Sequence, residues 1–201
     1  MLRRLACAAA LALSAAPLAE AGRDGAAVYD LSIAGLPIGE ARLAATRGEG
    51  RYVVEAEFDA GFLLWGRRGR GRAEGRAGPD GLTPERYEVR WEGGDRAGFQ
   101  QILFEEGRVA RVEREPPAEP DWFDNRVPLE GRHLRGVLDP LSAVIVAAPP
   151  DASPEAVCRR ALPVFTGFTR LDLVFEGARA EGGARGALGC AVRYRPVSGH
   201  R

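Results

Sequence analysis

The segment over residues 137–147 constrains the fold more than any other part of this sequence. It carries no charge after Asp139, and the next charged residue is Asp151. Asp139 can accept a hydrogen bond from a free N–H of a first helical turn, and Pro140 suits the first helical position because it has no N–H to leave unpaired. A helix that is apolar nearly all round must be covered on most sides, and this one is too short for a bilayer, which takes about 20 apolar residues. We therefore predict one short buried helix here.

The rest of the mature chain has the pattern of strands separated by turns. In residues 51–60, Tyr52, Val54 and Phe58 alternate with acidic residues, which is typical of a half-buried antiparallel strand. The same reasoning predicts strands at 28–34, 38–46, 67–77, 86–91, 99–104, 108–113, 162–165, 169–175 and 187–197. The predicted fold class is mainly β: a strongly curved antiparallel sheet, as a half-barrel or open barrel, wrapped around the buried helix.

Small and charged residues occupy opposite faces of the predicted strand 67–77. One face carries Gly69, Gly71, Ala73, Gly75 and Ala77, and the other carries Arg68, Arg70, Arg72, Glu74 and Arg76. Glycine within a strand often marks the close approach of another part of the chain. The small face would let the helix or another segment lie directly on the sheet, or would form the floor of a groove. The charged face is either a solvated surface or a surface that binds an anion.

The first 21 residues have the three parts of an export signal. Arg3 and Arg4 precede an apolar stretch over residues 5–16, and small residues end at Ala21. We predict cleavage near Ala21 and a periplasmic mature chain without a transmembrane segment. Residues 22–201 would form a single β-rich domain, truncated at its C-terminus because the sequence stops directly after a strong strand. The whole sequence has 28 basic and 28 acidic residues, which gives no attraction to nucleic acid.

Two cysteines, Cys158 and Cys190, remain after removal of the export signal. An even pair in an exported protein indicates a disulfide. The alternative is two unpaired buried thiols.

The pattern of reactive residues does not indicate catalysis. Ser142, His133 and Asp139 are near one another in sequence, but no Gly-x-Ser-x-Gly motif surrounds the serine. His133 and His200 are the only histidines, and they are too far apart in sequence to suggest a metal site. We predict no catalytic residue, no metal and no cofactor.

Four stretches of the sequence resemble a bacterial family of domains of unknown function, numbered 3108. They are residues 29–40, residues 138–143, Cys158 with the Pro-Val-Phe at 163–165, and residues 190–201. One departure is Thr166-Gly167-Phe168, where the family has Asp-Gly-Arg. The resemblance implies an exported envelope protein of uncharacterised activity. It also implies a fold similar to the lipoprotein carriers LolA and LolB, in which a curved sheet holds a helical plug over an apolar cavity.

Two functions fit these expectations. The first is a non-catalytic carrier or binding module for an apolar ligand such as a lipid. Its cavity would be lined by Tyr52, Val54, Phe58, Tyr87, Val89, Leu141 and Ile145. The second is an envelope scaffold or interaction protein with a filled core, no small-molecule ligand and an envelope protein as its partner. Packing distinguishes them, because a carrier needs a cavity of several hundred Å³ and a scaffold needs none.

Overall fold

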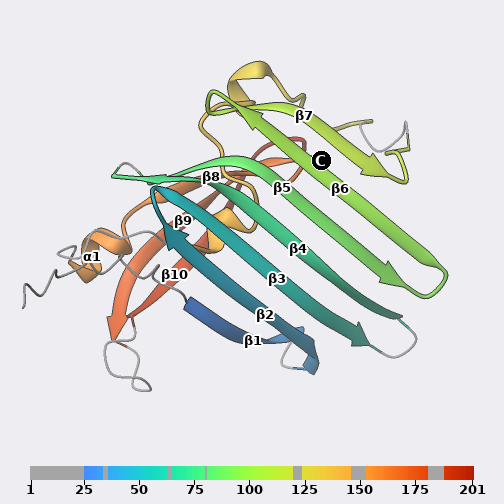
Figure 1. Cartoon of the computed structure of the whole chain (residues 1–201), viewed down its shortest axis with the longest axis horizontal. Helices are drawn as coiled ribbons and strands as arrows, with labels where there is room; N and C mark the ends of the chain where they lie inside the picture. The colour runs from blue at the N-terminus through green and yellow to red at the C-terminus, as the bar shows by residue number, and fades with distance from the viewer. Residues whose placement is uncertain are drawn as a thin grey trace, which may run out of the picture.

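The computed structural model describes residues 25–33, 36–62, 65–79, 81–119, 124–145, 153–180 and 188–201, so the predicted export signal lies outside the described residues. Within these described residues, ten antiparallel strands form a seven-stranded and a three-stranded sheet (Figure 1). The large sheet contains, in chain order, β1 (Gly25–Ile33), β2 (Leu36–Gly48), β3 (Arg51–Phe62), β4 (Trp65–Gly78), β5 (Gly81–Gly93), β6 (Arg96–Glu105) and β7 (Arg108–Glu115). The small sheet has the order β10 (Leu188–Ser198), β9 (Arg170–Ala180) and β8 (Ala161–Phe165).

The helices in the described residues are short. They are two 3-10 helices, η2 (Gly131–Leu134) and η3 (Ser142–Val144), and one α-helix, α1 (Pro154–Val157). None of these is long and apolar enough to cross a membrane. The predicted class, mainly antiparallel β structure with very little helix, is confirmed.

Tight hairpins connect neighbouring strands of the large sheet. Glu49 and Gly50, between β2 and β3, have φ of 52° and 73°, and Glu106 and Gly107, between β6 and β7, have φ of 50° and 72°. Two-residue turns with positive φ at both positions match the right-handed twist of the strands that they join. Strands that are consecutive in the chain are therefore neighbours in the sheet.

The core lies between the large sheet and the small sheet, which crosses behind one end of β3 to β6 (Figure 1). Val54, Ala73, Tyr87 and Ile102 are consecutive partners across β3, β4, β5 and β6, and all four are buried. Phe165 of β8 packs against this row from the small sheet. The inward faces predicted from alternation are therefore the faces that form the core.

The helix predicted over residues 137–147 is wrong. The described part of this segment contains only the single turn η3, and Val144 remains 48% exposed. Leu138 is extended instead, because its N–H donates to Pro163 O and its C=O accepts from Phe165 N, each at 2.8 Å. Residues 146–147 lie outside the described residues. The predicted burial is correct for the first part of the segment, where Val137 and Ala143 are buried.

The segment around Leu138 connects the edges of the two sheets. Arg135 forms an isolated bridge with Arg108 of β7, and Leu138 forms one with Val164 of β8. The N–H of Gly136 also donates to Gly107 O at 2.8 Å. This segment therefore pairs with the backbone of both sheet edges, at one end of β7 and near the end of β8.

A second connection holds the turn between β8 and β9 against the large sheet. Gln100 Nε2 donates to Thr166 O at 2.8 Å, and Arg114 Nη2 donates to Gly167 O at 2.5 Å. The Arg114 guanidinium also lies over the Phe168 ring, 3.4 Å from its centroid. The ring of Phe168 therefore binds the cation of Arg114 across the two sheets.

The disulfide between Cys158 and Cys190 is confirmed, with the two Cα atoms 5.4 Å apart. It joins the residue after α1 to β10, and Cys158 is fully buried. The bond closes a loop of 32 positions within the small-sheet half of the chain.

Replacing both cysteines, as Cys158→Ala/Cys190→Ala, should lower the free energy of unfolding by about 3–4 kcal/mol. The reason is that the unfolded chain regains the freedom that the closed loop removes. Urea denaturation with and without a reductant measures this effect. The reductant should destabilise the wild-type chain and leave the double variant unchanged. A loss below about 1 kcal/mol would contradict the loop-entropy explanation.

Candidate functional site

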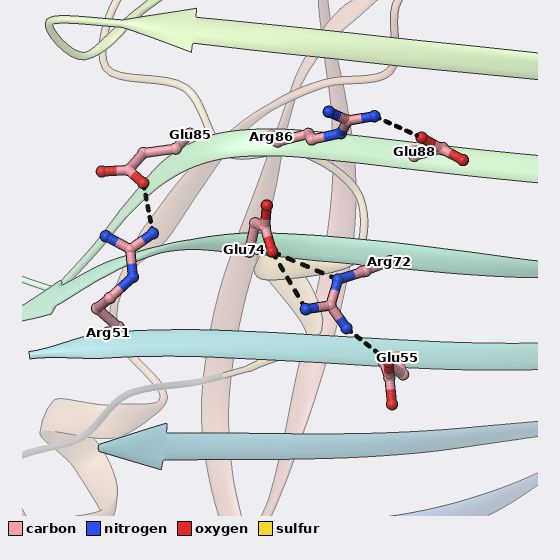
Figure 2. Close-up of polar contacts among 7 residues, drawn as sticks. All are labelled: Arg51, Glu55, Arg72, Glu74, Glu85, Arg86 and Glu88. Carbon is pink, nitrogen blue, oxygen red and sulfur yellow. Dashed lines mark hydrogen bonds and ion pairs between the residues drawn. The ribbon is translucent and has the colours of Figure 1, made fainter. Parts of the chain in front are cut away.

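Most charged residues of the large sheet lie on the face opposite the core, whereas Arg47, Arg67 and Arg114 are on the core side. Figure 2 shows part of this polar face, where Arg72 donates to Glu55 Oε1 at 2.6 Å and to Glu74 Oε2 at 3.2 Å, and Arg86 donates to Glu88 Oε2 at 2.9 Å. These side chains are largely exposed, so each pair contributes no more than about 1 kcal/mol. Over this part of the face, the solvated-surface interpretation of the arginine pattern fits the geometry.

A hollow of about 840 Å³ lies over another part of the large sheet. Its lining includes four triplets, 57–59, 68–70, 90–92 and 97–99, one from each of β3 to β6, together with Glu40, Arg42 and Glu115. In each triplet the outer two residues point to the polar face, because side chains alternate along a strand. The hollow therefore opens on the polar face, and the middle residues contribute its floor.

Pairing of charges is incomplete in the hollow. Arg68 Nε is 2.7 Å from Glu92 Oε1, and Arg90 Nε donates to Glu88 Oε1 at 3.0 Å. Arg70 lies between them without a hydrogen bond or ion pair to any residue that the structure describes. The hydrogen bond from Arg86, together with that from Arg90, holds the pKa of Glu88 below its usual value despite partial burial.

The glycines of β4 and β6 are explained by what lies on them from the core side. A Cβ at Gly69 would be 2.6 Å from Phe58 Cζ, and one at Gly98 would be 2.2 Å from two atoms of the Trp91 ring. A Cβ at Gly71 would be 2.9 Å from Leu141 Cδ1. The small face of β4 therefore accommodates side chains that lie directly on the backbone, including one from the segment predicted to cover it.

Six of the seven predicted cavity residues meet in the core. Tyr52, Val54 and Tyr87 are buried there, and the partly buried Val89, Leu141 and Ile145 pack against the same cluster. Phe58 instead is among the residues that line the hollow. The six residues pack on one another, and none of them lines either of the two hollows found in the described part of the chain.

Asp139 forms the centre of a buried polar network. Its Oδ1 accepts from the N–H groups of Leu141 and Ser142, both at 2.9 Å, as expected of a capping carboxylate, although it caps a turn that follows Pro140. Its Oδ2 is 2.5 Å from Ser142 Oγ, which is 2.6 Å from Tyr52 Oη. Because ionised Asp139 can only accept, Ser142 must donate to it and Tyr52 must donate to Ser142.

Burial dominates the titration of this network. It raises the pKa of Asp139, although hydrogen bonds from Ser142 and Leu141 act in the opposite direction. It also raises the pKa of Tyr52 and of Tyr87. Both Asp139 and Ser142 are 0% exposed, so no substrate in solvent reaches the hydroxyl.

The histidines lie away from this network. His133 Nδ1 accepts from the N–H of Glu130 at 3.1 Å, and the ring of His200 lies against Tyr194. A serine-hydrolase triad is therefore not assembled around Ser142. Within the described ranges, no group of three or more His, Cys, Asp or Glu could hold a metal ion.

Sequence reasoning missed two features. One is the hollow, to which Arg90, Ala97 and Phe99 contribute from β5 and β6. The other is Asp172, which is buried and accepts from Arg170 Nη1 at 2.6 Å and from Arg195 Nε at 3.0 Å. Burial alone would raise the pKa of Asp172, but the two arginines outweigh it and lower the pKa. No local pattern marks either group, because both depend on which strands are neighbours.

The comparisons with known proteins agree with the sequence motifs and add no activity. A family model described as a protein of unknown function (DUF3108) matches residues 28–182. No curated protein and no solved structure matches the chain, so the resemblance to LolA and LolB has no structural match behind it.

Asp139→Asn tests the charge state of the buried network. The raised pKa means that folding makes the carboxyl harder to ionise than it is in the unfolded chain, so the contribution of Asp139 to stability falls as pH rises above the unfolded value of about 3.9. The free energy of unfolding of Asp139→Asn minus that of the wild type should therefore increase between pH 4 and pH 7. Urea denaturation of both proteins at several pH values measures this difference. The contributions of the other titrating groups are the same in both proteins and cancel. A decrease with pH would show that the hydrogen bonds outweigh burial.

Proposed function

This chain belongs to the DUF3108 family of proteins of unknown function, and we propose that it is a non-catalytic binding module of the cell envelope whose ligand occupies the hollow on the polar face. The observation that carries the proposal is the contrast between the two faces of the large sheet. Apolar side chains fill the core side, whereas the polar side has a hollow of about 840 Å³, within the range of small-molecule sites.

The chemistry of the described side chains supports binding rather than catalysis. Ser142 is the hydroxyl that lies closest to a catalytic arrangement, and it is enclosed by Asp139 and Tyr52. The hollow presents carboxylates and guanidinium groups, which form charge-assisted hydrogen bonds. Export to the periplasm is part of the proposal, and the disulfide is consistent with an oxidising compartment.

Carriage of an apolar ligand is a second candidate, favoured by one observation. Phe58 and Trp91 lie on the core-side face beside the buried row, and both remain partly exposed. A half-barrel that opens at this end could admit an acyl chain onto these rings. The ligand would then contact the core-side rings of Phe58 and Trp91 and not the charged side chains of the hollow.

Substitutions at two alanines on the polar face distinguish these sites. Ala97→Trp places a large ring in the hollow, whereas Ala44→Trp places it on the same face outside the hollow lining. Both alanines are exposed, so neither change disturbs the core. Native mass spectrometry of protein extracted gently from the periplasm should show a bound species with the wild type and Ala44→Trp, and its loss with Ala97→Trp.

Other outcomes of the same measurement contradict the proposal. An apo mass for all three proteins would argue against a small-molecule ligand and favour a scaffold. A copurified lipid that persists in Ala97→Trp would favour the carrier function instead.

A further inference from the structure

We propose that the hollow binds a dipolar ligand of the size of a dipeptide, with its carboxylate between Arg70 and Arg90 and its ammonium group at Glu57. This inference rests on the proposed function, because it names the ligand class of the same hollow. It follows from the order of charges along one row of register partners, from the spacing of the strands, and from the aromatic ring next to the second arginine of the row. The row crosses β3 to β6 through Glu57, Arg70, Arg90 and Phe99.

The row contains two arginines directly opposite each other. Arg70 of β4 is the register partner of Arg90 of β5, and both line the hollow. Directly opposite like charges destabilise a sheet. Arg90 shares Glu88 with Arg86, and Arg70 makes no ion pair with any described residue. An anion placed between the two guanidinium groups would relieve their repulsion.

Two carboxylates beside Arg70 also have no ion-pair partner among the described residues. Glu57 of β3 is the register partner of Arg70 on its other side, and Asp59 lies two residues further along β3. Both line the hollow, and neither forms an ion pair with Arg70 or with another residue of the described chain. The neighbouring Arg68 is engaged by Glu92 at 2.7 Å. A cation at Glu57 therefore meets a carboxylate without a partner.

The spacing of the strands selects the length of the ligand. Neighbouring strands are about 4.8 Å apart, so the midpoint of Arg70 and Arg90 is about 7 Å from β3, measured across the sheet. An extended peptide advances about 3.4 Å per residue, so the terminal groups of a dipeptide are also about 7 Å apart. A single amino acid is too short to span this distance, and a tripeptide is longer than it.

The position next to Arg90 favours an apolar side chain on the second residue of the ligand. Phe99 of β6 is the next register partner after Arg90, and the Arg90 guanidinium lies over its ring, 4.4 Å from the centroid. Ala97, two residues away on the same face, leaves space beside the ring. A phenylalanine at the C-terminal position of the ligand would contact Phe99.

The test is a titration of the isotope-labelled full-length mature chain with Ala-Phe, followed by NMR of the backbone amides of Gly69 and Gly98 in the floor of the hollow. We expect saturable shifts with Ala-Phe. We also expect binding about fivefold weaker for each of N-acetyl-Ala-Phe and Ala-Phe-amide, since each has lost one charge–charge contact at an exposed site.

Three variants assign each charge to a residue. Arg70→Gln should weaken Ala-Phe up to about fivefold and reduce the discrimination against Ala-Phe-amide, because only Arg90 remains at the carboxylate. It should keep the discrimination against the acetylated peptide. Glu57→Gln should also weaken Ala-Phe about fivefold, but it should remove the discrimination against N-acetyl-Ala-Phe and keep that against Ala-Phe-amide. Arg76→Gln is the matched control, because Arg76 is an exposed arginine of the same strand that pairs with Glu85 outside the hollow. It should bind all three peptides as the wild type does.

Each alternative result is decisive. Equal binding of free and blocked peptides, or a loss with only one of the two blocking groups, would overturn the dipolar ligand. If Ala-Phe causes no shifts while Ala97→Trp still displaces a native ligand, the ligand class is wrong and the proposed site remains. If neither ligand nor shifts are found, both proposals fail.

Discussion

The buried carboxylate of Asp139 and the residues around it join the two sheets. On one side of Asp139, the backbone of Leu138 pairs with β8 of the small sheet. On the other side, Ser142 Oγ accepts a hydrogen bond from the hydroxyl of Tyr52, which belongs to β3 of the large sheet. An unpaired carboxylate would be costly at this depth, but Asp139 accepts from two N–H groups and one hydroxyl. The core between the sheets depends on this satisfied network.

The same connection explains why the two faces of the large sheet differ. Leu141 is held directly over Gly71, where a larger residue would meet its Cδ1 atom. With the core side covered in this way, most of the charged residues of β3, β4 and β5 are left on the polar face. Most of them pair with one another, but Arg70 does not, and the hollow lies around it. Binding is therefore proposed for the face that does not build the core.

The strands could be predicted because their evidence is local. Alternation with a period of two is visible within each segment, and Tyr52 and Val54 were correctly assigned to the core. The disulfide followed from an even pair of cysteines in a chain that is predicted to be exported. The helix failed for the opposite reason. The N–H and C=O of Leu138 pair with β8, which is distant in sequence, and this tertiary pairing replaces the local hydrogen bonds of a helix.

Local patterning by itself determined the strands, their inward faces, the capping role of Asp139 and the pairing of Cys158 with Cys190. Only the tertiary structure decided where charges of the same sign meet. Glu57, Arg70, Arg90 and Phe99 come from four strands, and no sequence spacing relates them. Their alignment depends on the register of three hairpins, and a shift of one residue in any of them would move a side chain to the opposite face.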